Sequence, residues 1–440
     1  MKTSDRLELA HWVARAAQAA GADDAAVDIV HSRAVEVEYR DGQVDNLTES
    51  TQNSLNIEIY ALDGSSAHVT SDLRRDSIGE FVRDSVDMTK YLGEDAFRKL
   101  PDPKYYQGLE KHDLDLFDHG YDDVTSDQRV TLARELQALA AGGSDKIVST
   151  SAGFYDSQSE AVKVHSNGFE GITQSTSFAV GAEVTLDDGK GGRPSDWNYV
   201  TTRHLADIPD SKSLASVAVE RALSQLGQTK VASGLYDMVI VNRAAGNPIY
   251  SLFGPLSGRA LQQKQSFLDG RLGEQIASDK MTLIDDPFIK RGLGSRHYDG
   301  EGMVCHKRTI IEAGILKQYL IDTYYGRKLD MEPTGGSTSN LLFNYGDKSL
   351  EQMIQTVAKG ILVTQFVGGN SNSTTGDFSW GLKGMLIEDG KIVKPVNEMN
   401  ISGNLKELWM NLVEVGNDPY EYSSIRRPSL HFTNVQFSGI

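Results

Sequence analysis

The sequence predicts an α+β protein, with two diverged helix–strands–helix repeats and antiparallel sheet in its N-terminal region and a β-rich α+β domain in its C-terminal region. Three observations predict this class. A helix-like segment precedes strand-like segments twice in the same order. Two short segments of these repeats align without gaps. After about residue 231, glycine-rich loops separate strand-like segments.

The first repeat is expected over residues 1–92. An apolar stripe with helical spacing predicts a helix over 4–20, and a second helix is expected over about 73–91. Between them, apolar and polar residues alternate as they do in strands of a half-buried sheet. Two Asp-Gly pairs predict the hairpin turns between these strands: Asp41-Gly42 and Asp63-Gly64.

A polar and acidic connection, residues 93–125, separates the repeats and is expected to be irregular. Its histidines, at 112 and 119, match no ligand spacing, so we interpret them as solvated. The second repeat is expected over 126–230. Its elements are a helix near 126–141, strands near 146–155, 160–166, 172–186 and 196–203, and a helix near 211–226.

A duplication explains the repeated order of elements. The segments "STQNSLNIEIYALDG" (50–64) and "STSFAVGAEVTLDDG" (175–189) share five of fifteen residues without a gap. Two unrelated α+β pieces that share hairpin chemistry remain the alternative.

The C-terminal domain is expected over residues 231–440. Its glycine-rich loops match neither a P-loop nor a dinucleotide-binding fingerprint, so turn and bulge chemistry is the preferred interpretation. Strands are expected near 237–241, 281–285, 302–310 and 361–368, a hairpin at "MLIEDGKIVKP", and helices near 248–265, 348–358 and 404–413.

The composition fits a protein of two or three domains that does not bind nucleic acid. With 44 basic and 61 acidic residues, the 440-residue chain has a net charge of −17, which opposes binding to a phosphate backbone. The single cysteine, Cys305, excludes an internal disulfide and suits a reducing compartment. We find no signal peptide and no apolar stretch that could cross a bilayer, so we expect a cytoplasmic protein without a membrane partner.

No complete catalytic or metal-binding pattern occurs in the sequence. Ten histidines are present, and no two of them follow HExxH, HxxEH or HExxxH order. Cys305 and His306 are adjacent, so on a strand their side chains diverge and do not readily chelate one ion. Asp285 and Asp286 precede Pro287, where a turn or strand end explains them. We expect no catalytic residue and no metal ligand in this chain.

The stretch "YDMVIVNRAAGNPIYSLF", residues 236–253, keeps the frame of a zinc protease site without its ligands. A strand-like run delivers the chain to Asn242 and Arg243, and Asn247 follows after three small residues. Histidines at 242 and 247 with a glutamate at 243 would form HExxxH. Asn247 and Pro248 also make a good N-cap and first-turn pair, which predicts that the next helix begins at Pro248.

Longer segments carry a resemblance to a known family. They include "RDGQVDNLTEST", "HSNGFEG", "RALQQKQSFLDGRLGEQIASDKMTLIDDP", "DGEGMVCHKRTIIEAGILKQYLIDTYYGRKL", "EPTGGSTSNL" and "TTGDFSWGLKGMLIEDGKIVKPVNEMNISGNLKEL". These segments cover most of the chain from about residue 35. Through them the chain resembles the TldD/PmbA family. These are peptide-cleaving metalloproteases once called modulators of DNA gyrase. More narrowly, the chain resembles the PmbA/TldE-like branch, which lacks HExxxH.

The resemblance implies that this chain has lost a zinc site. In the TldD-like branch, HExxxH and a distant cysteine hold zinc. Here the matching positions are Asn242, Arg243 and Asn247, and the region of the cysteine contains Ser423 and Ser424. Amides and hydroxyls bind zinc poorly compared with imidazole and thiolate, and Arg243 adds a fixed cation. We therefore expect no cofactor in this chain and zinc in a TldD-type partner.

The resemblance also implies a function. PmbA-type chains assemble with a TldD-type zinc subunit, and the pair cleaves unfolded or extended peptides in an enclosed cavity. This chain would be the non-catalytic half of a heterodimer. A homodimeric peptide-binding protein without protease activity and a metallopeptidase with an unrecognised site remain the alternatives. Candidate residues that line the peptide cavity lie in the glycine-rich segment from 368: Gly368, Asn370, Thr375, Asp377 and Phe378.

Overall fold

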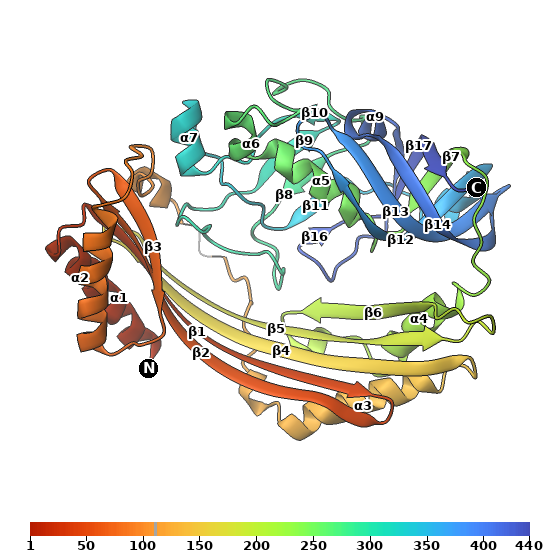
Figure 1. The fold of residues 1–440 in the computed structure, drawn as a ribbon, viewed down its shortest axis with the longest axis horizontal. Coiled ribbons are helices and arrows are strands. Elements are labelled where there is room, and N and C mark those ends of the chain that lie inside the picture. Colours follow the sequence, from red (N-terminus) through yellow and green to blue (C-terminus); the bar gives the residue numbers. More distant parts are fainter. Residues whose placement is uncertain (110–111) are drawn as a thin grey trace.

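The computed structural model describes residues 1–109 and 112–440. Part of the connection expected over 93–125 therefore lies outside the described residues. The fold is α+β, with an antiparallel N-terminal sheet and a β-rich C-terminal part (Figure 1). This confirms the predicted fold class.

In the described residues, six antiparallel strands form one curved sheet, which we call the N-terminal sheet. Its order is β3-β2-β1-β4-β5-β6, so each expected repeat contributes three neighbouring strands. β1 pairs with β4 and joins the two halves into one continuous sheet. The strands are β1 (Asp24–Arg40), β2 (Gln43–Ala61), β3 (Gly64–Thr70), β4 (Ile147–His165), β5 (Glu170–Leu186) and β6 (Ser195–Thr202).

Helices cover one face of this sheet, in pairs at its two ends (Figure 1). α1 (Thr3–Ala19) and α2 (Arg75–Thr89) pack on Val27 and Ile57 at one end. α3 (Ser126–Ala141) and α4 (Ser211–Leu223) pack on Val35 and Phe154 at the other end. Val27 and Val35 are an even number of residues apart on β1, so both helix pairs cover the same face.

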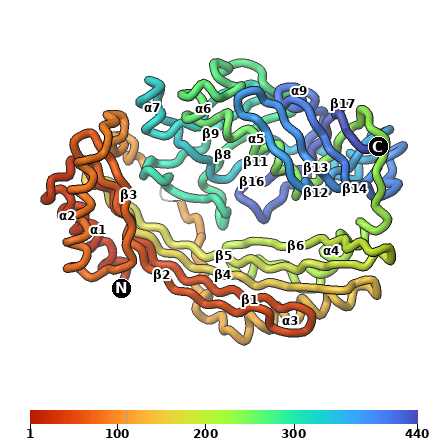
Figure 2. The backbone as a smooth tube through the Cα atoms, viewed as in Figure 1, coloured from red at the N-terminus to blue at the C-terminus, as the bar shows by residue number. Residues whose placement is uncertain are grey.

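The opposite face of the N-terminal sheet carries serines along its middle and the rings of Tyr155 and Tyr199 toward β6, and the C-terminal part lies on this concave side (Figure 2). Serines from three strands meet in register: Ser32 pairs with Ser159, Ser159 with Ser175, and Ser157 with Ser177. The burial alternates at both ends of β1 because one face is packed against helices and the other is not.

Local turn chemistry explains the hairpins of this sheet. Asp41 and Gly42 both have positive φ, 46° and 87°, and connect β1 to β2 as predicted. The second turn is shifted by one residue, because Leu62 and Asp63 adopt positive φ and Gly64 begins β3. A side chain on Gly64 would lie 2.9 Å from the carbonyl oxygen of Thr89. This glycine therefore permits close packing on α2 rather than the turn itself.

Two other expected elements differ from the structure. The strands expected over 146–155 and 160–166 are one strand, β4, because its polar middle pairs with both β1 and β5. The connection between the repeats contains short 3-10 helices and buries Leu100 and Tyr121. These helices are η1 (Pro103–Tyr106) and η2 (Tyr121–Asp123), and a further one, η3 (Leu205–Asp207), precedes α4.

The outer half of β2 pairs with β1 on one side and has no strand neighbour on the other side within the described residues. β3 pairs only with residues 55–61 of β2, whereas β1 pairs with β2 down to Gln43. The edge of residues 43–54 therefore stays open.

Two sheets form the C-terminal part around a large apolar core. The six-stranded sheet has the order β14-β13-β12-β7-β17-β15, and the five-stranded sheet has the order β10-β9-β8-β11-β16. The strands of these two sheets are β7 (Gly234–Ile240), β8 (Leu283–Asp285), β9 (Arg308–Glu312), β10 (Ile315–Leu316), β11 (Leu341–Phe343), β12 (Lys359–Ser371), β13 (Asp377–Glu388), β14 (Lys391–Asn404), β15 (Leu412–Val415), β16 (Ile425–Arg426) and β17 (Leu430–Ser438).

The single helix expected over 248–265 is two helices, α5 (Gly246–Leu256) and α6 (Gly258–Gln262). Pro255 removes a hydrogen-bond donor from the last turn of α5, and the Ser257 side chain accepts from the Ala260 N–H to cap α6. The remaining helices are α7 (Thr323–Leu329), α8 (Leu350–Gln355) and α9 (Leu405–Met410). Among the described residues, no helix combines the length and the apolar character that crossing a membrane requires.

Candidate functional site

The stretch that keeps the frame of a zinc site lies at the end of a central strand. β7 pairs with β12 on one side and β17 on the other, and Met238, Val239 and Ile240 are fully buried. An apolar run without polar alternation suits this doubly covered strand. A turn then carries the chain to α5, so Asn242 and Arg243 lie between a rigid strand and a helix.

Asn242 holds the turn to a distant loop. Its backbone N–H donates to Ser429 Oγ at 3.1 Å, and its side-chain amide donates to the Asp418 carbonyl oxygen at 2.9 Å. Ser429 Oγ in turn donates to the Asp418 carboxylate. The amide nitrogen of Asn242 thus has a structural partner of its own.

Arg243 forms a buried ion pair with the N-terminal sheet. Its two terminal nitrogens each donate to one oxygen of Asp196 on β6, both at 2.9 Å. The two side chains are only 9% and 3% exposed. Asp196 also accepts from the Gln225 side chain at 2.9 Å, so its carboxylate is well supplied with donors. This two-bond geometry fixes the direction of the guanidinium as well as its charge.

Arg427 joins the segment of Asn242 and Arg243 to the segment of Ser423. It donates to the Arg243 carbonyl oxygen and to Ser423 Oγ, both at 3.1 Å. Burial lowers the pKa of Arg427. Burial, followed by the nearby charge of Arg243, lowers the pKa of Arg221 to about 10. The neighbouring Ser424 contributes its backbone carbonyl to the Leu341 N–H. This part of the site is therefore rich in cations.

Asn247 lies within α5 rather than at its cap. α5 begins at Gly246 after Ala245, whose side chain offers no cap, so the predicted start at Pro248 is wrong by two residues. The turn over 242–245 leads directly into the helix and makes an asparagine cap unnecessary. The Asn247 carbonyl oxygen accepts from Ser251 Oγ at 2.9 Å.

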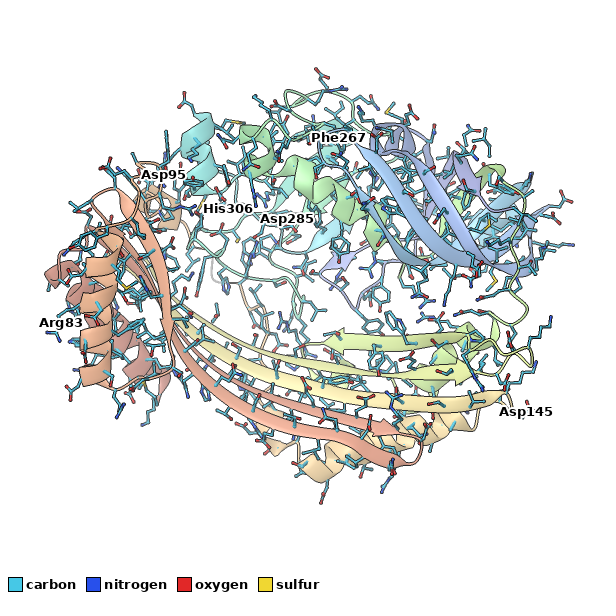
Figure 3. All side chains as sticks on the ribbon, viewed as in Figure 1. Arg83, Asp95, Asp145, Phe267, Asp285 and His306 are labelled. Atoms are coloured by element: carbon cyan, nitrogen blue, oxygen red, sulfur yellow. The ribbon has the colours of Figure 1, made fainter. Side chains whose placement is uncertain are left out.

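A cavity of about 850 Å³ lies between α5–α6 and the β12–β13 connection, and we call it the α5–α6 cavity. Of the candidate peptide-contacting residues, Asn370, Asp377 and Phe378 line it, whereas Gly368 and Thr375 are not among its lining residues. Phe267, labelled in Figure 3, lies next to this region, and its N–H donates to the Ser373 carbonyl oxygen. The other lining residues are Gly254, Ser257, Arg259, Ala260, Gln263, Gln265, Ser371, Asn372, Ser373, Thr374 and Ser379.

No residue on the α6 side of this cavity was predicted as a site residue. Arg259 and Gln263 lie in a segment that carries part of the family resemblance but no chemical motif, and only the break at Ser257 brings them opposite β12. Asp377 has a structural role as well, because hydrogen bonds from Thr375 and Asn404 lower the pKa of its carboxyl group.

Known domains match most of the chain. Residues 233–439 match the PmbA/TldA metallopeptidase C-terminal domain, and residues 120–226 match the PmbA/TldA metallopeptidase central domain. This chain belongs to the PmbA/TldD metallopeptidase family. It is similar to the metalloprotease PmbA of Escherichia coli O157:H7, at 30% identity over 95% of this chain and 92% of that protein.

Solved structures of family members share the fold. A proposed modulator of DNA gyrase from Bacteroides thetaiotaomicron is 39% identical, with a TM-score of 0.97 and full coverage of both chains. TldE from Thermococcus kodakarensis is 20% identical, with a TM-score of 0.86 over 98% of this chain and 100% of that chain. The second likeness concerns the fold alone.

The side chains at the positions that the sequence resemblance matches to HExxxH do not fit a zinc ion. Zinc in a peptidase needs imidazole, carboxylate or thiolate donors. The matching positions hold Asn242, Arg243 and Asn247, and Arg427 brings a second guanidinium beside them. Within residues 1–109 and 112–440, no three His, Cys, Asp or Glu side chains form a group that could hold a metal.

Proposed function

We propose that this chain is the non-catalytic, TldE-like subunit of a TldD-type metalloprotease complex. In this proposal a TldD-type partner supplies zinc, and this chain helps to enclose and hold an unfolded or extended peptide. A cytoplasmic location is part of the proposal, because the chain has a single cysteine and no internal disulfide.

One observation carries the proposal: Arg243, which the resemblance matches to the catalytic glutamate, forms a buried ion pair with Asp196 on the N-terminal sheet. A general base needs a carboxylate near the metal-bound water. A guanidinium neither accepts a proton nor binds a cation. Because this side chain is buried and doubly hydrogen-bonded, it does not leave the position to make room for a metal.

The concave face and the α5–α6 cavity support the role in holding peptide. Serines line the middle of the concave face, and the cavity volume is within the range of small-ligand sites. Extended peptides gain much of their binding from main-chain hydrogen bonds to sheet edges. The fold offers such edges at β2 and β12.

Reconstitution with a TldD-type chain of the same organism tests the proposal. The measurement is the cleavage rate of an unfolded peptide by the partner alone, by this chain alone and by the mixture. We expect cleavage only in the mixture, and zinc that copurifies with the partner. If the partner alone is as active as the mixture, this chain is not a subunit of the protease.

Metal analysis of the purified chain provides the second test. Zinc at one ion per chain after dialysis would contradict the proposal and favour a metallopeptidase with a different site. The matched variant is Arg243→Glu, which restores the charge of the catalytic residue without adding histidines. We expect no zinc in this variant either.

The open edge of β2 favours a second candidate function, a homodimeric peptide-binding protein without protease activity. A second copy could pair its own β2 with residues 43–54, since two antiparallel edges are mutually complementary. The mass of the purified chain in solution, measured with and without a TldD-type chain, separates the two. A stable homodimer that does not exchange with the partner would favour this candidate.

A further inference from the structure

β12 leaves part of its edge open next to α5. It pairs with β7 only through residues 360–363, but continues to Ser371 along β13. On the side of α5, the described residues provide no strand for 364–371. Val367 is 47% exposed, and the residues from 368 to 371 are exposed as well. Residues 367–371 are therefore the exposed part of this edge, whereas 364–366 are half-buried.

A glycine bulge shapes this edge. Gly368 and Gly369 have φ values of +122° and +111°, and the pairing with β13 shifts between Phe366 and Gly369. A side chain on Gly369 would lie 2.1 Å from the Ser379 carbonyl oxygen, so this position requires glycine. Bulges bend a strand and redirect its edge, and here the strand continues into the α5–α6 cavity.

One face of α5 runs beside the open edge. Asn247, Ser251 and Gly254 are spaced four and three residues apart, so they share this face. Ser251 Oγ lies 3.2 Å from Ser371 Oγ. A side chain on Gly254 would lie 2.5 Å from Ser373 Oγ. The α5 face that carries Asn247 thus leads to Gly254, which lines the cavity.

The cavity carries one uncommitted charge. Apart from Arg259 and Asp377, its lining is uncharged and consists mainly of amides and hydroxyls. The Asp377 carboxylate accepts from Thr375 and Asn404. Arg259 is exposed and, among the described residues, has no acidic partner. In a chain with a net charge of −17, this guanidinium is a local site for a negative group.

We propose that an extended peptide binds as an added strand along residues 364–371 of β12 and places a carboxylate against Arg259. The carboxylate belongs to an acidic side chain or to the peptide's C-terminus. This inference rests on the proposed peptide-holding role and specifies its location and ligand chemistry. Main-chain hydrogen bonds to β12 supply general affinity, and Arg259 selects for negative charge.

Fluorescence anisotropy with the full chain tests the charge preference. The probes are fluorescein-labelled peptides of about twelve Gly, Ser and Thr residues. One carries a central Glu and a C-terminal amide, a second carries Gln and the amide, and a third carries Gln and a free C-terminal carboxylate. We expect the first or the third to bind about tenfold more tightly than the second. The peptide that binds more tightly identifies the source of the carboxylate.

Arg259→Gln is expected to remove this preference and to leave the affinity for the Gln amide unchanged. Arg83→Gln is the matched control, because Arg83 is exposed on α2, far from Phe267 in Figure 3. Equal binding of all three peptides, or a preference that survives Arg259→Gln, would overturn the proposal.

N-methylation of the peptide tests strand addition independently of charge. Because alternate amides of an added strand face its neighbour, methyl groups at every second position should abolish binding, and those between should be tolerated. Uniform tolerance would refute pairing with β12. If the mixture with the TldD-type partner still cleaves peptide while the isolated chain fails both binding tests, this site is wrong and the subunit role stands.

Discussion

Two of the junctions between the N-terminal sheet and the C-terminal part have opposite chemistry. At the end of β6, Asp196 and Arg243 form the ionic junction, a buried pair with both bonds at 2.9 Å. At the end of β4, rings form the aromatic junction: Tyr106, His165, Phe169 and Tyr298. The first depends on matched opposite charges, and the second depends on side chains that remain neutral.

The aromatic junction is packed edge to face and is hydrogen-bonded. The rings of Phe169 and Tyr298 are 5.0 Å apart and nearly perpendicular. Tyr106 Oη and His165 Nδ1 are 3.0 Å apart. Burial lowers the pKa of His165 to about 3, and it raises those of Tyr106 and Tyr298 to about 12. These groups therefore stay uncharged in the folded protein around neutral pH.

The comparison shows that two contacts between the same parts of the chain have different weaknesses. The ionic junction fails when one partner is removed, since the other charge is then left buried and unpaired. The aromatic junction fails when its histidine is forced to take up a proton. The experiments below perturb each in turn, from the largest expected effect to the smallest.

Asp196→Ala should be the most damaging substitution. It leaves the Arg243 guanidinium buried without its carboxylate, which typically destabilises a protein by about 3–5 kcal/mol. The measurement is the free energy of unfolding from urea titration. Asp145→Ala is the control, because Asp145 is an exposed aspartate outside the ion pair and should change stability by less than about 0.5 kcal/mol. Similar small effects of both substitutions would show that the ion pair does not hold the junction.

Acid should weaken the aromatic junction through His165. The folded pKa of about 3 lies below the ordinary value of 6.5, so below pH 6.5 the unfolded chain binds more protons than the folded chain. Stability then falls as the pH drops, by about 1.4 kcal/mol per unit, or about 2 kcal/mol between pH 6.5 and 5. Comparison with His165→Phe isolates this contribution. The difference in the free energy of unfolding between the unsubstituted chain and His165→Phe should be constant above pH 7.5 and should shrink below pH 6.5. A difference that stays constant down to pH 5 would contradict the assignment.

Gly171→Ala should disturb the same junction without changing a charge. A side chain at Gly171 would lie 2.5 Å from the Tyr298 ring, so the ring must move. We expect a loss of about 1.5 kcal/mol in the free energy of unfolding, within the usual range for overpacking. A double variant with Gly171→Ala and Tyr298→Leu tests whether the loss comes from the contact with the Tyr298 ring. If the double variant loses the sum of the two single effects, the ring and the glycine are not coupled.

Lys163→Met should have the smallest effect. Lys163 lies at the edge of the aromatic junction, pairs with Asp28 at 3.0 Å and donates to the Gly300 carbonyl oxygen. Because the pair is only partly buried, its loss should lower stability by about 1 kcal/mol, and the effect should shrink in 1 M salt, where the screening length is about 3 Å. An effect that does not depend on salt would assign the contribution to the carbonyl hydrogen bond.

Sequence alone predicted the features that local chemistry decides. The Asp41-Gly42 turn follows from the backbone freedom of the two residues, and the apolar run before Asn242 predicts a buried strand. The turn at Asp63-Gly64 was misplaced because Gly64 is needed for packing on α2, a contact that the local sequence does not contain.

Sequence could not predict the partners of the site residues. Arg243 and Asp196 lie 47 residues apart on different parts of the fold, and nothing local to either indicates the other. The same holds for Arg259, which reaches the α5–α6 cavity only because the helix breaks at Ser257. The sequence already shows asparagines at 242 and 247. The hydrogen bonds that hold Arg243 and Arg427 in place become known only from the folded chain.

The open half of β2 has a consequence for the exchange of hydrogen with solvent. Along residues 43–54, alternate amides point toward β1 and the rest point outward, where no acceptor lies among the described residues. In deuterated water the outward amides should therefore exchange much faster than their neighbours, so that every second residue is labelled early. A chain that pairs with this edge would slow the exchange of the outward amides, so its binding could be detected before the chain is identified.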